Sequence, residues 1–118
     1  MKPNGFLLVS VPNLAAWHSR ISLLLGYQPY QCEVSFYYHV GTIVELDGAN
    51  KHIRAFTLRA LKRLLQKHGF ETLAVAGAPS EHVSEVRKKL SWLPMILDDF
   101  FSRFPSIAGH DIVLCKKR

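Results

Sequence analysis

The stretch MKPNGFLLVSVPN (Met1–Asn13) decides the fold. Its turn signal, PNG, precedes Phe6–Val11, a continuous apolar run rich in β-forming residues. Such a run is typical of a strand that is covered on both faces, as in a parallel sheet. Pro12 ends the strand, and Asn13 is a good N-cap for a following helix. A doubly covered strand needs neighbours on both sides, so its position at the start of the sequence needs an explanation.

The remaining composition is that of one small globular domain spanning residues 1–118. Hydrophobic residues make up 48% of the chain and charged residues 20%, which excludes a disordered protein. No apolar run is long enough to cross a membrane, and no secretory signal is visible, so we expect a cytoplasmic protein. The two cysteines, Cys32 and Cys115, have no spacing that favours a metal site or a disulfide framework, so we expect reduced thiols.

Outward from the first strand, periodicity and turn signals predict alternating strands and helices. The clearest helix is 57–68, where Thr57 can cap, leucines form one face and Gly69 can end the helix. Pro94 predicts a kink or two shorter helices in the apolar seam between residues 80 and 104. The expected elements are strand 6–11, helix 13–25, lid 27–51, helix 57–68, strand 70–76, one helix or two kinked helices 80–104, and strand 110–115. This order predicts an α/β fold in which helices flank a small three-stranded sheet.

Three segments carry a resemblance to a known family. KPNGFLLVSVPN, NKHIRAFTLRALKRLLQKHGFE and HDIVLCKKR resemble the C-terminal half of class I S-adenosylmethionine-dependent methyltransferases. In that family, strand five follows a Lys-Pro-Gly-Gly turn, matched here by KPNG, and a motif like HIRAFT (His52–Thr57) opens the helix before strand six. The resemblance implies a partial Rossmann-like methyltransferase fold with a small mixed sheet, and it places strand seven beside strand five.

The same resemblance shows which family features the 118 residues lack. The family holds its cofactor on a Gly-rich turn after the first strand and on an acidic residue that ends the second, and no GxG occurs here. We therefore expect a truncated, substrate-side half that binds no cofactor alone and is inactive alone, whereas the full-length family uses S-adenosylmethionine. A start site assigned too late and a gene broken by mutation both explain a sequence that opens at strand five.

Candidate substrate residues follow from the resemblance, because the lid and the segment before the next helix bind substrate in that family. They are Asn13, Trp17, Tyr37, Tyr38, His39, His52 and Arg54. Each also has a structural interpretation: Asn13 as an N-cap, Trp17 as core, the tyrosines as lid packing, and His52 and Arg54 as partners of a backbone group or carboxylate. The histidine spacing predicts no metal site, and no catalytic residue is assigned.

Partners follow from the missing neighbour of the first strand. An open, uncharged strand edge predicts either a homodimer through the first strand or a missing N-terminal half. The alternative function is a binding or assembly module that uses the apolar seam 83–104, whose mixed charges argue against a membrane surface. The net charge of +6 is spread along the chain, so we expect no specific nucleic-acid binding.

Overall fold

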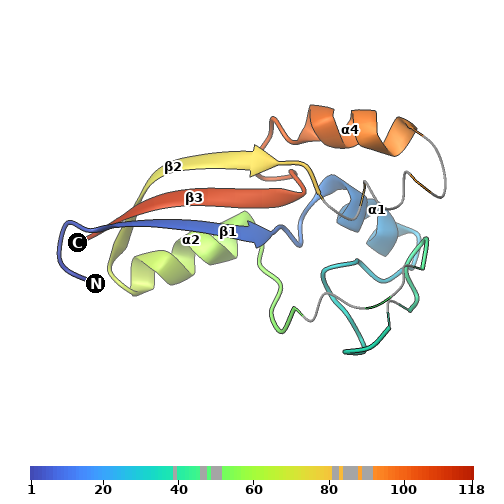
Figure 1. Cartoon of the computed structure of the whole chain (residues 1–118), viewed down its shortest axis with the longest axis horizontal. Helices are drawn as coiled ribbons and strands as arrows, with labels where there is room; N and C mark the ends of the chain where they lie inside the picture. Colours follow the sequence, from blue (N-terminus) through green and yellow to red (C-terminus); the bar gives the residue numbers. More distant parts are fainter. Residues whose placement is uncertain (39, 46–47, 49–51, 81–82, 84–87, 89–91) are drawn as a thin grey trace.

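The computed structural model describes residues 1–38, 40–45, 48, 52–80, 83, 88 and 92–118. The chain is elongated, with extents of 47 × 30 × 22 Å. The sheet fills one end, where both termini lie, and the loops and remaining helices gather at the other end (Figure 1). Of the predicted elements, parts of the lid 27–51 and of the helical region 80–104 lie outside the described residues.

The sheet contains three strands in the order β1-β3-β2. They are β1 (Phe6–Pro12), β2 (Phe70–Ala78) and β3 (His110–Lys117). The central strand β3 runs antiparallel to both neighbours. The α/β class and the three-stranded sheet are therefore confirmed, but the prediction of a mixed sheet is wrong. The reason is that β3 lies between two strands that share one direction, so no parallel pair is adjacent in the described sheet.

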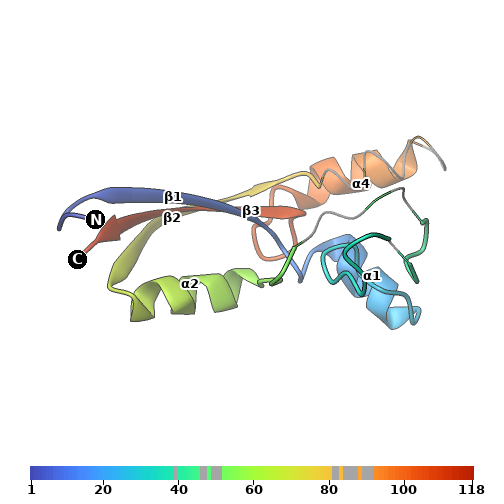
Figure 2. The ribbon, with the colours of Figure 1, turned by 60° about the horizontal axis from the view of Figure 1, so that its bottom comes forward.

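One face of the sheet is covered by α2 (Leu58–Lys67) (Figure 2). The core consists of Leu61 from α2 and of Val113 and Cys115 from β3, each at most 4% exposed. Alternate residues of β1 pack against it, because successive side chains of a strand point to opposite faces. The partly buried neighbours of this core are Leu7, Val9, Val11, Phe56, Leu58, Leu65, Phe70 and Val75.

Both ends of α2 are closed by local chemistry. The Thr57 side chain accepts a hydrogen bond from the Ala60 N–H at 3.2 Å, as an N-cap does. At the other end, Gly69 adopts φ +77°, a left-handed conformation that costs glycine little. The helix therefore occupies 58–67, within one residue at each end of the range that its leucine spacing predicts.

On the opposite face of the sheet, the side chains of β1 are exposed to solvent. Phe6 and Leu8 are 65% and 67% exposed, whereas Leu7 and Val9 on the other face are half-buried. The prediction that β1 is covered on both faces is therefore wrong for the described residues. Within the described sheet, β1 is also an edge strand, because it pairs with β3 alone.

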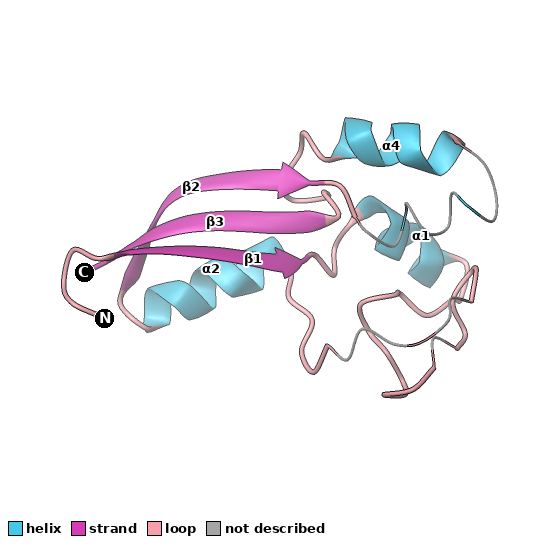
Figure 3. Ribbon diagram, viewed as in Figure 1, coloured by secondary structure: helices cyan, strands magenta, loops and turns pink. Residues whose placement is uncertain are grey.

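The carboxyl ends of β1 and β2 point toward the rest of the molecule (Figure 3). There lie α1 (Trp17–Leu24), the loop after it, and α4 (Leu93–Phe101). Helix α1 begins four residues later than position 13, where the sequence predicted its start. Pro94 lies in the first turn of α4, where a missing backbone N–H costs nothing, and most of the predicted helical segment before it lies outside the described residues.

Candidate functional site

Asn13 closes the carboxyl end of β1 and is fully buried. Its Nδ2 donates to the carbonyl oxygens of Pro105, Ser106 and Ala108 at 3.0–3.3 Å. Its Oδ1 accepts from the Ala15 N–H at 2.9 Å, which forms a turn instead of capping α1. The predicted N-cap role is therefore wrong, and Asn13 instead joins β1 to the loop that precedes β3.

A buried polar network extends from Asn13 into the predicted lid. Gln31 is 2% exposed, and its Nε2 donates to the Asn13 carbonyl oxygen at 3.4 Å. The Ser19 hydroxyl of α1 donates to the Gln31 Oε1 at 2.9 Å. Buried amides and hydroxyls stabilise a fold only when they are paired in this way. The network therefore fixes the first part of the lid to α1 and to the end of β1.

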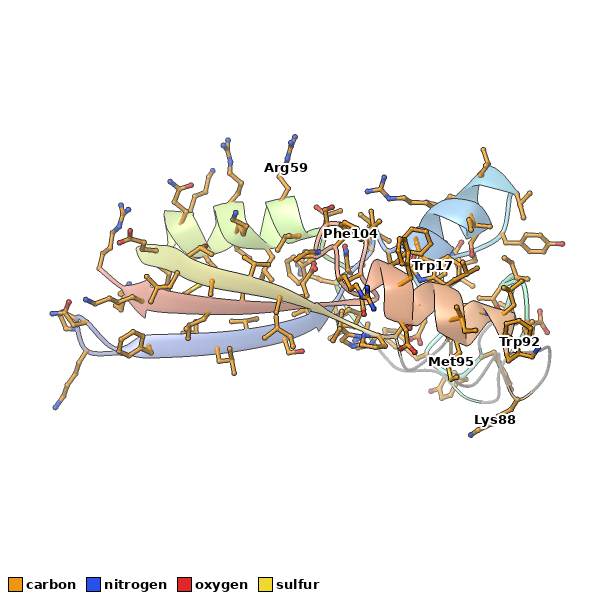
Figure 4. The ribbon with its side chains drawn as sticks, turned by 90° about the horizontal axis from the view of Figure 1, so that it is seen from above. Trp17, Arg59, Lys88, Trp92, Met95 and Phe104 are labelled. Carbon is orange, nitrogen blue, oxygen red and sulfur yellow. The ribbon has the colours of Figure 1, made fainter. Side chains whose placement is uncertain are left out.

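Trp17 connects α1 to α4. Its Nε1 donates to the Asp98 Oδ1 at 2.8 Å, and its ring stacks on Phe101 with centroids 5.6 Å apart. The other carboxylate oxygen of Asp98 accepts from the Ser80 N–H at 2.6 Å. Burial raises the pKa of Asp98, although these two hydrogen bonds oppose the shift. These contacts hold Trp17 on the side of α4 that faces α1. Trp92 lies at the N-terminal end of α4, away from Trp17 (Figure 4).

Between α1, the lid and the start of α4 lies an apolar hollow of about 140 Å³. We call it the α1 hollow. Its lining residues are Trp17, His18, Ile21, Ser22, Tyr30, Ile43, Val83 and Pro94. A space of this size and character accommodates a small apolar group rather than a charged one. It lies beyond the carboxyl end of β1.

Tyr30 closes this hollow from the side of the lid. The residue is 5% exposed, and its hydroxyl donates to the Val44 carbonyl oxygen at 2.7 Å and accepts from the Val44 N–H at 3.1 Å. Burial raises the pKa of the Tyr30 hydroxyl, so the group stays neutral at physiological pH. The Tyr30 side chain therefore joins the first part of the predicted lid to the backbone at Val44.

The structure does not gather all the predicted site residues. Trp17 lines the α1 hollow and Asn13 supports it, but Tyr37 and Tyr38 are 75% and 67% exposed, with rings 6.4 Å apart. His52 lines a separate small depression beside Phe36. Arg54 is also exposed, and His39 lies outside the described residues.

Sequence reasoning missed four residues of this region: His18, Tyr30, Gln31 and Asp98. Asp98 carried a usable signal, because it is an acidic residue within a run of apolar residues on α4. His18 and Tyr30 follow no period that separates them from ordinary surface residues. Gln31 is paired through a contact between segments that the sequence does not place together.

The chemistry of the α1 hollow is that of binding and orientation. His18 is its titratable imidazole, and no carboxylate or cysteine of the described residues lines it. Across the described ranges, no group of His, Cys, Asp and Glu side chains is arranged to hold a metal ion. No helix in the described part of the chain is long and apolar enough to cross a membrane.

Neither a protein-family model nor a curated protein matches this chain.

Proposed function

We propose that this chain is the substrate-side half of an S-adenosylmethionine-dependent methyltransferase, with the methyl acceptor held in the α1 hollow. The observation that carries the proposal is the position of this hollow. It lies beyond the carboxyl end of β1, between α1 and the segment that the sequence resemblance makes an acceptor lid. Its apolar lining favours a small or lipid-like acceptor.

The sheet supports the same proposal. The resemblance places strand seven beside strand five, and β3 pairs with β1 in an unbroken antiparallel register from Phe6 opposite Lys116 to Pro12 opposite His110. The outer edge of β1 has no partner in the described sheet, which leaves room for a strand of a cofactor-binding half. Because methyl transfer depends on orienting donor and acceptor, this half alone has no catalytic activity.

The first prediction concerns the cofactor. The 118-residue chain should give no micromolar binding of S-adenosylmethionine in a calorimetric titration, because it has no Gly-rich turn. The same chain, joined to the polypeptide encoded directly upstream of Met1, should bind the cofactor and transfer its methyl group.

Two outcomes contradict this proposal. One is micromolar cofactor binding by the 118-residue chain, since it would require a site that the half-enzyme does not supply. The other is an upstream reading frame without a Gly-rich turn, since no cofactor-binding half would then accompany this one.

A second candidate function is an assembly module that uses the outer face of α4. Along α4, Leu93, Ile96 and Phe100 recur at helical spacing and are each about half exposed, and Trp92 before them is 64% exposed. An apolar stripe that faces solvent is typical of a surface that binds a partner. This α4 stripe is separate from the bare face of β1, so the two surfaces can be tested independently.

The second prediction distinguishes these two surfaces. In light scattering after size exclusion, we expect the isolated chain to dimerise through β1, because an apolar, uncharged edge recruits another strand. Leu8→Lys should restore the monomer, while the matched change Ile96→Lys should leave the dimer intact. Both side chains are at least half exposed, so neither change disturbs the core.

The reverse pattern, with Ile96→Lys giving the monomer, would favour the assembly module. A wild-type chain that is monomeric at high concentration would contradict the dimer. A convincing dimer interface should bury more than about 1,000 Å² in total.

A further inference from the structure

A second, larger groove runs along α2 on the side of β2. Its volume is about 730 Å³, within the range of small-molecule sites. We call it the α2 groove. Its lining includes the apolar residues Leu58 and Phe70 and the hydroxyl-bearing residues Thr57 and Ser106. It is lined by a different set of residues from the α1 hollow, so ligand binding in this groove is independent of the proposed function.

Positive charge dominates the lining of the α2 groove. Five basic side chains contribute, and they come from three separate parts of the chain: Arg20 of α1, Arg59, Lys62 and Arg63 of α2, and Arg118 at the C-terminus. Glu71 is the one acidic residue among the described residues of the lining, and Arg118 lies 3.5 Å from it. The fold has thus brought distant cations to one concave surface, where their fields add.

The arrangement is unfavourable for α2 by itself. Arg59 and Arg63 are four residues apart on one side of the helix, and like charges at this spacing destabilise a helix. Arg59 also lies in the first turn, at the positive end of the helix dipole, and this turn contains no acidic residue. Figure 4 shows Arg59 extending from α2 on the side away from the sheet. An anion at this position would relieve both unfavourable interactions at once.

The cations follow the length of the α2 groove. Arg59 lies in the first turn of α2, Lys62 and Arg63 lie in the middle of the helix, and the Arg118 N–H beyond its last turn donates to the Gly69 carbonyl oxygen. Arg20 is held in place by the hydrogen bond from its Nε to the Ala15 carbonyl oxygen at 2.8 Å. Since a helix rises about 1.5 Å per residue, Arg59 and Arg63 are separated by about 6 Å along its axis.

We propose that the α2 groove binds an elongated small molecule that carries several phosphate groups. Arginine suits this ligand class, because its planar guanidinium donates two parallel hydrogen bonds to phosphate oxygens. The spread of these cations along the groove favours a chain of phosphates over a single anion. Leu58 and Phe70, which also line the groove, are available to contact the uncharged part of such a ligand.

The test is a calorimetric titration of the intact chain with inorganic tripolyphosphate at an ionic strength of about 50 mM, where surface charges are weakly screened. We expect a Kd below about 100 µM. Arg59→Gln and Arg63→Gln should each weaken binding about tenfold, because each removes a charge-assisted hydrogen bond. The matched control is Lys67→Gln, which removes one charge from the same helix outside the groove and should change the Kd less than about twofold.

Two further measurements give the experiment a clear negative result. Inorganic sulfate should bind at least about tenfold more weakly than tripolyphosphate, since it is too short to contact the whole row of cations. No binding of tripolyphosphate up to millimolar concentration overturns the proposal. The proposal is also overturned if Lys67→Gln weakens tripolyphosphate binding as much as Arg59→Gln does. Tighter binding of a single-stranded oligonucleotide that depends equally on Lys67 overturns it too, because both results indicate a general cationic surface. Far-ultraviolet circular dichroism checks that each variant is folded.

Discussion

Asp111→Asn should stabilise the chain strongly at about pH 8, by on the order of 3 kcal/mol. Asp111 is fully buried in β3, and neither of its carboxylate oxygens has a hydrogen-bond partner among the described residues. Burial raises its pKa from 3.8 to about 7. At pH 8 the folded protein must bury an uncompensated charge, whereas asparagine at this position buries only a neutral amide.

The sign of the pH dependence follows from the direction of this shift. Between about pH 4 and pH 7, the unfolded chain releases the Asp111 proton while the folded chain keeps it, so folding becomes less favourable as pH rises. The contribution of Asp111 to the free energy of unfolding should therefore be highest near pH 4. It should fall as the pH rises through about 7 and change little above that. Asp111→Asn should remove this slope.

Urea unfolding at several pH values, followed by tryptophan fluorescence, provides the measurement. The same change at Asp99, an exposed residue of α4, serves as the control and should alter stability by less than about 0.5 kcal/mol. A free energy of unfolding that rises from pH 4 to pH 7 in the wild type, and equally in Asp111→Asn, would show that the Asp111 carboxylate is not desolvated as the structure indicates.

Elements with a regular apolar period were the most predictable from sequence. Leu58, Leu61 and Leu65 of α2 recur at helical spacing and face the core, so the bounds of the helix follow within one residue. The run at β1 gave a wrong prediction about its outer face, because a strand reveals an exposed face only when the exposed residues are polar. Phe6 and Leu8 are apolar although they are exposed, so the sequence of β1 resembles that of a strand covered on both faces.

The candidate site was less predictable, because contacts between distant segments build it. The hydrogen bond from Trp17 to Asp98 joins residues 81 positions apart, and no local pattern pairs them. The α2 groove is a similar case. The spacing of Arg59 and Arg63 predicts a polar helix face, but only the fold places Arg20 and Arg118 beside it. Propensity and periodicity describe single elements, while sites depend on how the elements pack.

Asn13→Ala should destabilise the chain by about 3 kcal/mol or more, since several buried groups lose their partners at once. The Asn13 side chain serves three carbonyl oxygens of residues 105–108 and the Ala15 N–H. The backbone at this point is hydrogen-bonded as well. The Asn13 N–H donates to the Gly109 carbonyl oxygen at 2.9 Å, and the Leu14 N–H donates to the Phe56 carbonyl oxygen at 2.7 Å. Loss of the amide therefore releases the loop before β3 as well as lowering stability.

Asn13→Asp tests the donor and acceptor atoms of this side chain separately. Aspartate keeps an acceptor for the Ala15 N–H but offers no N–H to the three carbonyl oxygens, and it adds a buried charge facing them. It should therefore be at least as destabilising as Asn13→Ala near neutral pH and recover partly in acid, where the carboxyl is protonated. Gln66→Ala removes an exposed amide from α2 and is the matched control, with an expected cost below about 0.5 kcal/mol. If urea unfolding gives Asn13→Ala the same small cost as Gln66→Ala, then Asn13 does not hold the end of β1 to the loop before β3, and the α1 hollow must keep its shape by apolar packing alone.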